Sequence, residues 1–180
     1  MQFSYNLSKV IIYTLFVLFF VACKDDTVKN KQQPVNLAEI EEQMLKVNTQ
    51  LVAIEDESIN KLIESKAWKM EETGTGLRWM IIEKGNGEKA QIGKIVSLEY
   101  KVYLLSGQLI YSSENTGLKI FELGHGGVET GLEEGILFLK LGDKARFILP
   151  SHLAYGLQGD GQLIPAKASL IYEVKLIDLK

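Results

Sequence analysis

The chain has 180 residues, of which 46% are apolar and 24% are charged. This composition supports one packed domain with an accessory segment and excludes a chain that is disordered throughout. The formal net charge of −3 leaves no positive excess for binding nucleic acid. Cys23 is the single cysteine, which excludes an intrachain disulfide. The two histidines, His125 and His152, do not have a spacing that indicates a metal site.

The N-terminus has the pattern of an export signal. Lys9 precedes an apolar run over residues 10–22, which is too short to span a bilayer as a permanent helix. The run ends at Cys23, and residues 20–23 (FVAC) resemble the lipobox of bacterial lipoproteins, in which the cysteine becomes the first mature residue and carries acyl chains such as palmitate. We therefore expect residues 1–22 to be a signal peptide and Cys23 to be the lipidation site. The alternative is a buried cysteine in a membrane anchor helix.

The mature chain is expected to be a mildly acidic, tethered protein of the cell envelope. Removal of residues 1–22 takes away one lysine and no acidic residue, so the net charge becomes −4. Lipid on Cys23 would hold the protein to a membrane, on the periplasmic side or at the cell surface. The Lys-Asp-Asp after this cysteine resembles an acidic surface-sorting signal, with a solvated linker as the alternative. Residues 23–35 are polar and lack periodicity, which predicts a linker.

A long amphipathic helix is predicted next. Asn36 has the pattern of an N-cap, with Glu39 completing a capping box. Apolar residues then recur every three or four positions, at Leu37, Ile40, Met44, Val47, Leu51 and Ile54, and resume out of phase at Ile59, Leu62, Ile63 and Trp68. We expect residues 36–76 to form a spacer helix and connector that is not needed for folding of residues 77–180. A dimerising coiled coil is the alternative, and the oligomeric state stays open.

The remainder of the chain has the pattern of an α+β domain of about a hundred residues. One short helix is expected within residues 128–138. Strands are predicted over residues 77–83, 95–105, 109–113, 119–123, 143–149 and 168–179, and the second and third form a hairpin.

Five motifs in this region resemble the FK506-binding-protein (FKBP) family of peptidyl-prolyl isomerases in order and spacing. They are Gly131–Gly135 (GLEEG), Leu141–Ala145 (LGDKA), Ala154-Tyr155-Gly156, Leu163-Ile164-Pro165 and Leu170–Leu176 (LIYEVKL). The resemblance covers residues 77–180, and the preceding helix and lipobox resemble lipoprotein members, including a gliding-motility-associated branch. It implies a curved antiparallel sheet of five or six strands wrapped around one short helix, with the ligand pocket between them.

Prolyl isomerisation does not require a catalytic triad, and the sequence offers no candidate for one. Rotating an Xaa-Pro amide requires crossing a barrier of about 18–20 kcal/mol, and no bond to a nucleophile has to form. An apolar pocket lowers this barrier because the planar amide is the more polar state, and one or two hydrogen bonds can favour the twisted amide. We therefore expect no cofactor, and proline-containing polypeptides as substrates.

The resemblance also implies the site residues. Tyr155 and Tyr100 are carried over as catalytic residues. Substrate binding is carried over to Tyr100, Ile110, Tyr111, Val128, Leu132, Tyr155, Ile164 and Tyr172. Tyr100 and Tyr172 lie on predicted strands, where simple packing is the alternative.

This sequence departs from the family at several pocket positions. Ile110-Tyr111 stand in place of Phe-Asp, which removes an acidic hydrogen-bond acceptor, and Leu132 replaces a tryptophan. Glu129 and Lys119 occupy positions where isoleucine and phenylalanine are expected. These changes predict a less aromatic pocket and a weaker enzyme.

Two classes of function remain open from the sequence. The first is a lipid-anchored isomerase that assists folding of exported proteins. The second is a catalytically weak or inactive FKBP-like module that binds unfolded chains or a membrane partner.

Overall fold

The structure is a computed structural model and describes residues 36–180. Helix α2 (Leu37–Ser65) starts directly after Asn36, whose carbonyl accepts the N–H groups of Glu39 and Ile40. The helix runs through the acidic segment 55–58 without a break and ends at Ser65, earlier than the sequence pattern predicts. Its end is a Schellman motif, because Trp68 N–H bonds to Ile63 C=O while Ala67 is left-handed, with a φ of 52°.

The two apolar stripes of α2 differ in burial. The first stripe, from Leu37 to Ile54, is exposed. In the second stripe, Ile59 is fully buried against Ile148 and Ile171, and Leu62, Ile63 and Trp68 pack around this cluster. Residues 43–180 form one compact unit, so the second half of α2 belongs to the folded domain. The proposed division at residue 76 stays a prediction, but residues 59–70 do more than separate two parts of the chain.

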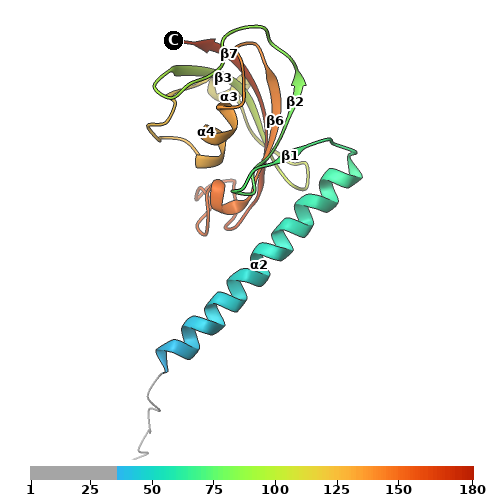
Figure 1. The fold of residues 1–180 in the computed structure, drawn as a ribbon, viewed down its shortest axis with the longest axis vertical. Coiled ribbons are helices and arrows are strands. Elements are labelled where there is room, and N and C mark those ends of the chain that lie inside the picture. The colour runs from blue at the N-terminus through green and yellow to red at the C-terminus, as the bar shows by residue number, and fades with distance from the viewer. Residues whose placement is uncertain (1–35) are drawn as a thin grey trace, which may run out of the picture. The chain divides into compact units, whose positions relative to one another are not determined.

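A single antiparallel sheet holds the domain together (Figure 1). Its strands are β1 (Glu71–Glu72), β2 (Arg78–Glu83), β3 (Ile95–Leu104), β4 (Leu109–Ser112), β5 (Lys119–Glu122), β6 (Lys144–Leu149) and β7 (Leu170–Leu179). The order is β1-β2-β6-β7-β3-β4, and β5 also pairs with β3, beyond the end of β4. Within residues 36–180 the sheet therefore has seven strands rather than five or six, because β1 adds a two-residue edge to β2.

The sheet curves around helix α4 (Thr130–Ile136), as Figure 1 shows. Two glycines allow this close packing. A β-carbon at Gly131 would lie 2.7 Å from the Leu149 side chain, and one at Gly135 would lie 2.9 Å from the Phe147 ring. The main core between helix and sheet consists of buried residues from Leu77 to Leu179. The α+β fold expected from the sequence is confirmed.

Two short elements were absent from the sequence prediction. Helix α3 (Ser113–Thr116) follows β4, and its N-terminal Glu114 N–H bonds to the Ser112 side chain. A 3₁₀ turn, η1 (Ser151–Leu153), opens the long loop 150–169 between β6 and β7. Both elements place residues of the candidate site. Among residues 36–180, no helix has both the length and the apolar character needed to cross a membrane.

Candidate functional site

A buried carboxylate lies at the centre of the candidate site. Glu129 immediately precedes α4, and its side chain is 4% exposed. The Tyr172 hydroxyl of β7 donates to Glu129 Oε1 at 2.6 Å, and the ammonium of Lys119 on β5 lies 3.2 Å from Oε2. The Tyr155 hydroxyl, from the loop 150–169, lies close enough to Glu129 for the carboxylate to raise its pKa. Four separate segments of the domain therefore meet at one carboxylate.

These contacts fix the charge state of the site. Burial alone would raise the pKa of Glu129, but Lys119 and the two tyrosine hydroxyls outweigh it and hold the pKa below its ordinary value. Burial and then the Glu129 carboxylate raise the pKa of Tyr155. Burial and the same carboxylate also raise the pKa of Tyr172. At neutral pH the site therefore holds an anionic Glu129 and two neutral, proton-donating tyrosines.

Tyr100 forms the next part of the site. Its hydroxyl lies 2.6 Å from Thr116 Oγ1, and Thr116 donates its own proton to the Ser112 carbonyl, so Tyr100 is the donor to Thr116. The Tyr100 and Tyr172 ring centroids lie 6.5 Å apart. The Lys119 ammonium lies 5.4 Å and 5.7 Å from these two centroids, within the range of cation–π attraction. Lys119 therefore brings a positive charge to a position where an apolar side chain is expected. The Glu129 carboxylate and the rings of Tyr100 and Tyr172 stabilise this charge.

Tyr111 pairs with Asp160 across the mouth of the loop 150–169. The Tyr111 hydroxyl donates to Asp160 Oδ2, and this hydrogen bond is the main cause that raises the pKa of Tyr111. Asp160 Oδ1 accepts the N–H groups of Gln162 and Ile164, each at 2.8 Å. Position 111 itself has no acidic side chain, but Asp160 brings a carboxylate to the Tyr111 hydroxyl from another segment. The effect of the changed residue on ligand binding stays a prediction.

The structure divides the eight predicted binding residues by exposure. Tyr100, Ile110, Tyr111, Val128 and Tyr155 are partly exposed and pack on the main core. Leu132 is fully buried, and Tyr172 and Ile164 are only 1% and 3% exposed. The partly exposed residues can contact a ligand directly, whereas the buried residues pack beneath the surface of the site. The catalytic and binding roles themselves stay predictions.

Sequence reasoning missed three acidic or basic members of this cluster. Lys119 and Glu129 were seen only as departures from the family, and Asp160 was not singled out. The sequence could have indicated Asp160, because it lies between two predicted site residues, Tyr155 and Ile164, in one glycine-rich loop. Among residues 36–180, no group of three His, Cys, Asp or Glu side chains is arranged to hold a metal ion. Cys23 lies outside the described residues.

The arrangement suits binding of a polar amide beside apolar surface. Half-buried tyrosine hydroxyls offer hydrogen bonds, while Val128 and Ile110 offer apolar contact. Both histidines have partners outside this cluster: His152 bonds to the Thr75 carbonyl, and His125 pairs with Glu122. The geometry therefore supports conformational chemistry, which needs no activated nucleophile.

Comparison with known proteins agrees with this geometry. Residues 86–177 match the model of the FKBP-type peptidyl-prolyl cis-trans isomerase family. The FK506-binding protein 1A of Neurospora crassa is 36% identical over 107 residues, which are 58% of this chain and 89% of that protein. A probable FKBP-type isomerase, FkpA of Neisseria meningitidis, is 38% identical over 59% of this chain, but the match spans only 39% of that protein.

A solved structure supports the same assignment. The crystal structure of FkpA from Escherichia coli is 27% identical, has a TM-score of 0.60, and covers 82% of this chain and 74% of that chain. The matched sequence region contains β3 to β6 and most of β7, together with Tyr100, Glu129 and Tyr155. The chain therefore belongs to the FKBP-type peptidyl-prolyl cis-trans isomerase family.

Proposed function

We propose that this protein is a lipid-anchored prolyl isomerase that assists the folding of exported proteins. The observation that supports catalysis best is the position of Tyr155. Tyr155 is partly exposed at the site, and burial and the nearby Glu129 carboxylate raise the pKa of its hydroxyl. A tyrosine with a raised pKa is neutral at pH 7, so its hydroxyl keeps a proton that it can donate to a substrate carbonyl.

The proposed mechanism uses desolvation and one or two hydrogen bonds. A proline ring entering beside Val128 and Ile110 leaves water, which lowers the energy of the twisted amide relative to the planar one. The hydroxyl of Tyr155 can then donate to the substrate carbonyl in place of Glu129. Since no bond is made or broken, the only requirement is that these contacts favour the twisted state.

The isomerase activity can be measured on a client whose refolding is limited by an Xaa-Pro step. The full-length chain in detergent micelles is expected to accelerate this slow phase. If the slow phase is unchanged while aggregation of the unfolded client is suppressed, the enzyme assignment fails and the module that binds unfolded chains replaces it.

Membrane anchoring is proposed on sequence grounds, from Cys23 after the apolar run 10–22 and from the similarity to lipoprotein members of the gliding-motility-associated branch. The test is metabolic labelling with a lipid precursor. Wild-type protein is expected to take up label and to fractionate with membranes, and Cys23→Ser is expected to lose the label. A Cys23→Ser variant that still takes up label and stays with the membrane contradicts the proposal.

A further inference from the structure

The loop that carries Tyr155 is held at both ends by one residue of α2. Glu55 Oε1 accepts the Ser151 backbone N–H at 2.6 Å and the Ser169 hydroxyl at 2.5 Å. The Ser151 hydroxyl donates to Glu55 Oε2 at 3.1 Å. Ser151 begins the loop, and Ser169, which is 6% exposed, immediately precedes β7. Three donors from two ends of the loop thus share one carboxylate.

These contacts close a ring of hydrogen bonds around Tyr155. The Ser151 carbonyl accepts Gly156 N–H at 2.8 Å, and the Gly156 carbonyl accepts Lys167 N–H at 2.8 Å. Ser169, two residues further on, returns to Glu55. Tyr155 lies between Ser151 and Gly156, so its backbone position depends on the closure of this ring.

The local sequence explains why the acceptor comes from another element. The first N–H groups of a helical turn have no partner within the turn and need a cap. The residue before η1 is Pro150, which makes no side-chain cap hydrogen bond. The Glu55 carboxylate fills this role for Ser151, as an Asp or Ser at the N-cap does elsewhere.

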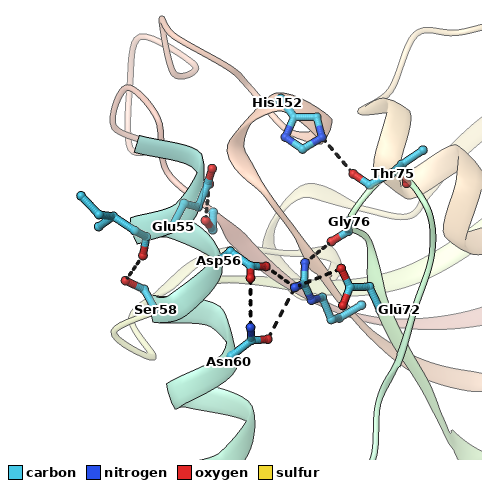
Figure 2. A network of polar contacts seen from close by, with 11 residues as sticks. Glu55, Asp56, Ser58, Asn60, Glu72, Thr75, Gly76 and His152 are labelled. Atoms are coloured by element: carbon cyan, nitrogen blue, oxygen red, sulfur yellow. Dashed lines mark hydrogen bonds and ion pairs between the residues drawn. The ribbon is translucent and has the colours of Figure 1, made fainter. Parts of the chain in front are cut away.

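The neighbouring acid, Asp56, has a different task. Figure 2 shows Asp56 and Asn60 of α2 and Glu72 of β1 converging on one guanidinium group, that of Arg78. Arg78 is 4% exposed and also donates to the Gly76 carbonyl. This cluster attaches α2 to β2, whereas Glu55 contacts the loop. Adjacent residues of α2 therefore contact different parts of the domain, Asp56 the Arg78 cluster and Glu55 the two ends of the loop.

We propose that Glu55 is a positioning residue of the isomerase, which acts through the loop 150–169 to place the Tyr155 hydroxyl. The proposal rests on the isomerase function proposed above. It makes α2 a part of the active site's support, in addition to any role as a spacer. Removal of the Glu55 carboxylate opens the ring of hydrogen bonds and lets Tyr155 move. This change weakens the contact to the twisted amide, so it lowers the rate of isomerisation more than it lowers substrate affinity.

The first experiment measures cis/trans exchange of a proline-containing peptide by NMR at several peptide concentrations, which separates kcat from KM. Glu55→Ala is expected to lower kcat about tenfold with little change in KM, and Glu55→Gln, which keeps one acceptor oxygen, to recover part of the rate. Glu57→Ala is the matched control, because Glu57 lies on the same helix and pairs only with Lys61 among the ion pairs of residues 36–180.

A double-mutant cycle then tests the route of the effect. In a Tyr155→Phe background, Glu55→Ala is expected to cause no further loss, since both changes remove the same hydroxyl contact. Full additivity, or a loss in Glu55→Ala no larger than in Glu57→Ala, overturns the proposal. Ser169→Ala is a milder second variant, expected to lower kcat in the same direction, and an unchanged kcat in both Ser169→Ala and Glu55→Gln also overturns it.

Hydrogen exchange distinguishes failure of this inference from failure of the proposed function. The Gly156 and Lys167 amides are expected to exchange at least several-fold faster in Glu55→Ala than in Glu57→Ala. A wild-type protein without isomerase activity contradicts the proposed function, and in that case unchanged exchange at these two amides contradicts the positioning role separately.

Discussion

Glu129 is a buried carboxylate at a place where burial by itself would favour the neutral acid. It stays ionised because the positive charge of Lys119 and the hydroxyl groups of Tyr155 and Tyr172 stabilise the carboxylate and lower its pKa. Among residues 36–180, no buried side-chain nitrogen or oxygen lacks a hydrogen-bond partner. The buried polar side-chain atoms of this site are therefore all hydrogen-bonded, and removal of one partner has a cost.

Stability should depend on pH through Glu129. Its pKa in the folded state lies below the ordinary value of 4.5, so its contribution is complete above that value and is lost as the pH falls through the folded pKa. Glu129→Gln is expected to lower the free energy of unfolding by about 2 kcal/mol at pH 7 and by less near pH 3, below the ordinary pKa of 4.5, measured by urea unfolding. Glu64→Gln, at an exposed position of α2, is the control, and an equal loss at both pH values contradicts this assignment.

Tyr155→Phe should slow the enzyme with little unfolding. The change removes one hydroxyl contact, worth about 1–3 kcal/mol at the twisted state, which corresponds to roughly ten- to a hundredfold in rate. Glu129 keeps Tyr172 and Lys119 as partners, so the fold is retained. Peptide exchange and thermal unfolding measured together check this. Tyr103→Phe is the control, because Tyr103 packs in the second cluster with Ile59, and an equal slowing in both variants would rule out the special role of Tyr155.

At the scale of elements, the packing of α4 against β6 depends on glycine. A β-carbon at Gly135 would meet three atoms of the Phe147 ring at 2.9–3.0 Å, closer than real contacts allow. Gly135→Ala is therefore expected to lower the free energy of unfolding by about 1–3 kcal/mol through overpacking. Gly74→Ala has nothing within 4 Å of the added atom and should leave stability almost unchanged. Urea unfolding of the two variants decides this, and equal stabilities would show that α4 shifts freely.

The alternation of β3 explains how one strand serves two clusters. Side chains of successive residues point to opposite faces of a sheet. Val102 is buried in the main core, whereas Tyr103 packs with the Ile59 cluster. The helix α2 therefore covers apolar residues on the face of the sheet opposite to α4. The first stripe of α2 is exposed and belongs to neither of these two clusters.

At the scale of the whole molecule, the main core is independent of α2. Every residue of that core lies at or beyond Leu77. A chain of residues 77–180 is therefore expected to keep a cooperative thermal transition. It loses Ile59, whose burial contributes about 2–3 kcal/mol, and also the α2 and β1 partners of the buried Arg78, so its midpoint should fall by at least roughly 10 °C relative to a chain that starts at residue 43. Loss of cooperativity would show that α2 is essential to the core, and an unchanged midpoint would show that the Ile59 cluster contributes nothing.

The sequence by itself determined the elements with a local cause. The strands 95–105 and 168–179, the helix near Gly131 and the helix start at Asn36 follow from side-chain periodicity and capping, which depend on neighbours a few residues away. The five motifs also indicated the family, and through the family the tyrosines at 100, 155 and 172. The end of α2 was missed because a left-handed Ala67 has no signal comparable to glycine.

Only the tertiary structure decided which charges meet. Three sets of contacts join segments that are far apart in the sequence. They are Tyr111 with Asp160, Glu129 with Lys119 and Tyr172, and Glu55 with Ser151 and Ser169. No periodicity encodes such pairs, since their distances depend on how the sheet curves and where the loop 150–169 returns. A buried or half-buried polar group must find a partner to offset its lost hydration, and several partners can serve equally well until the chain is folded.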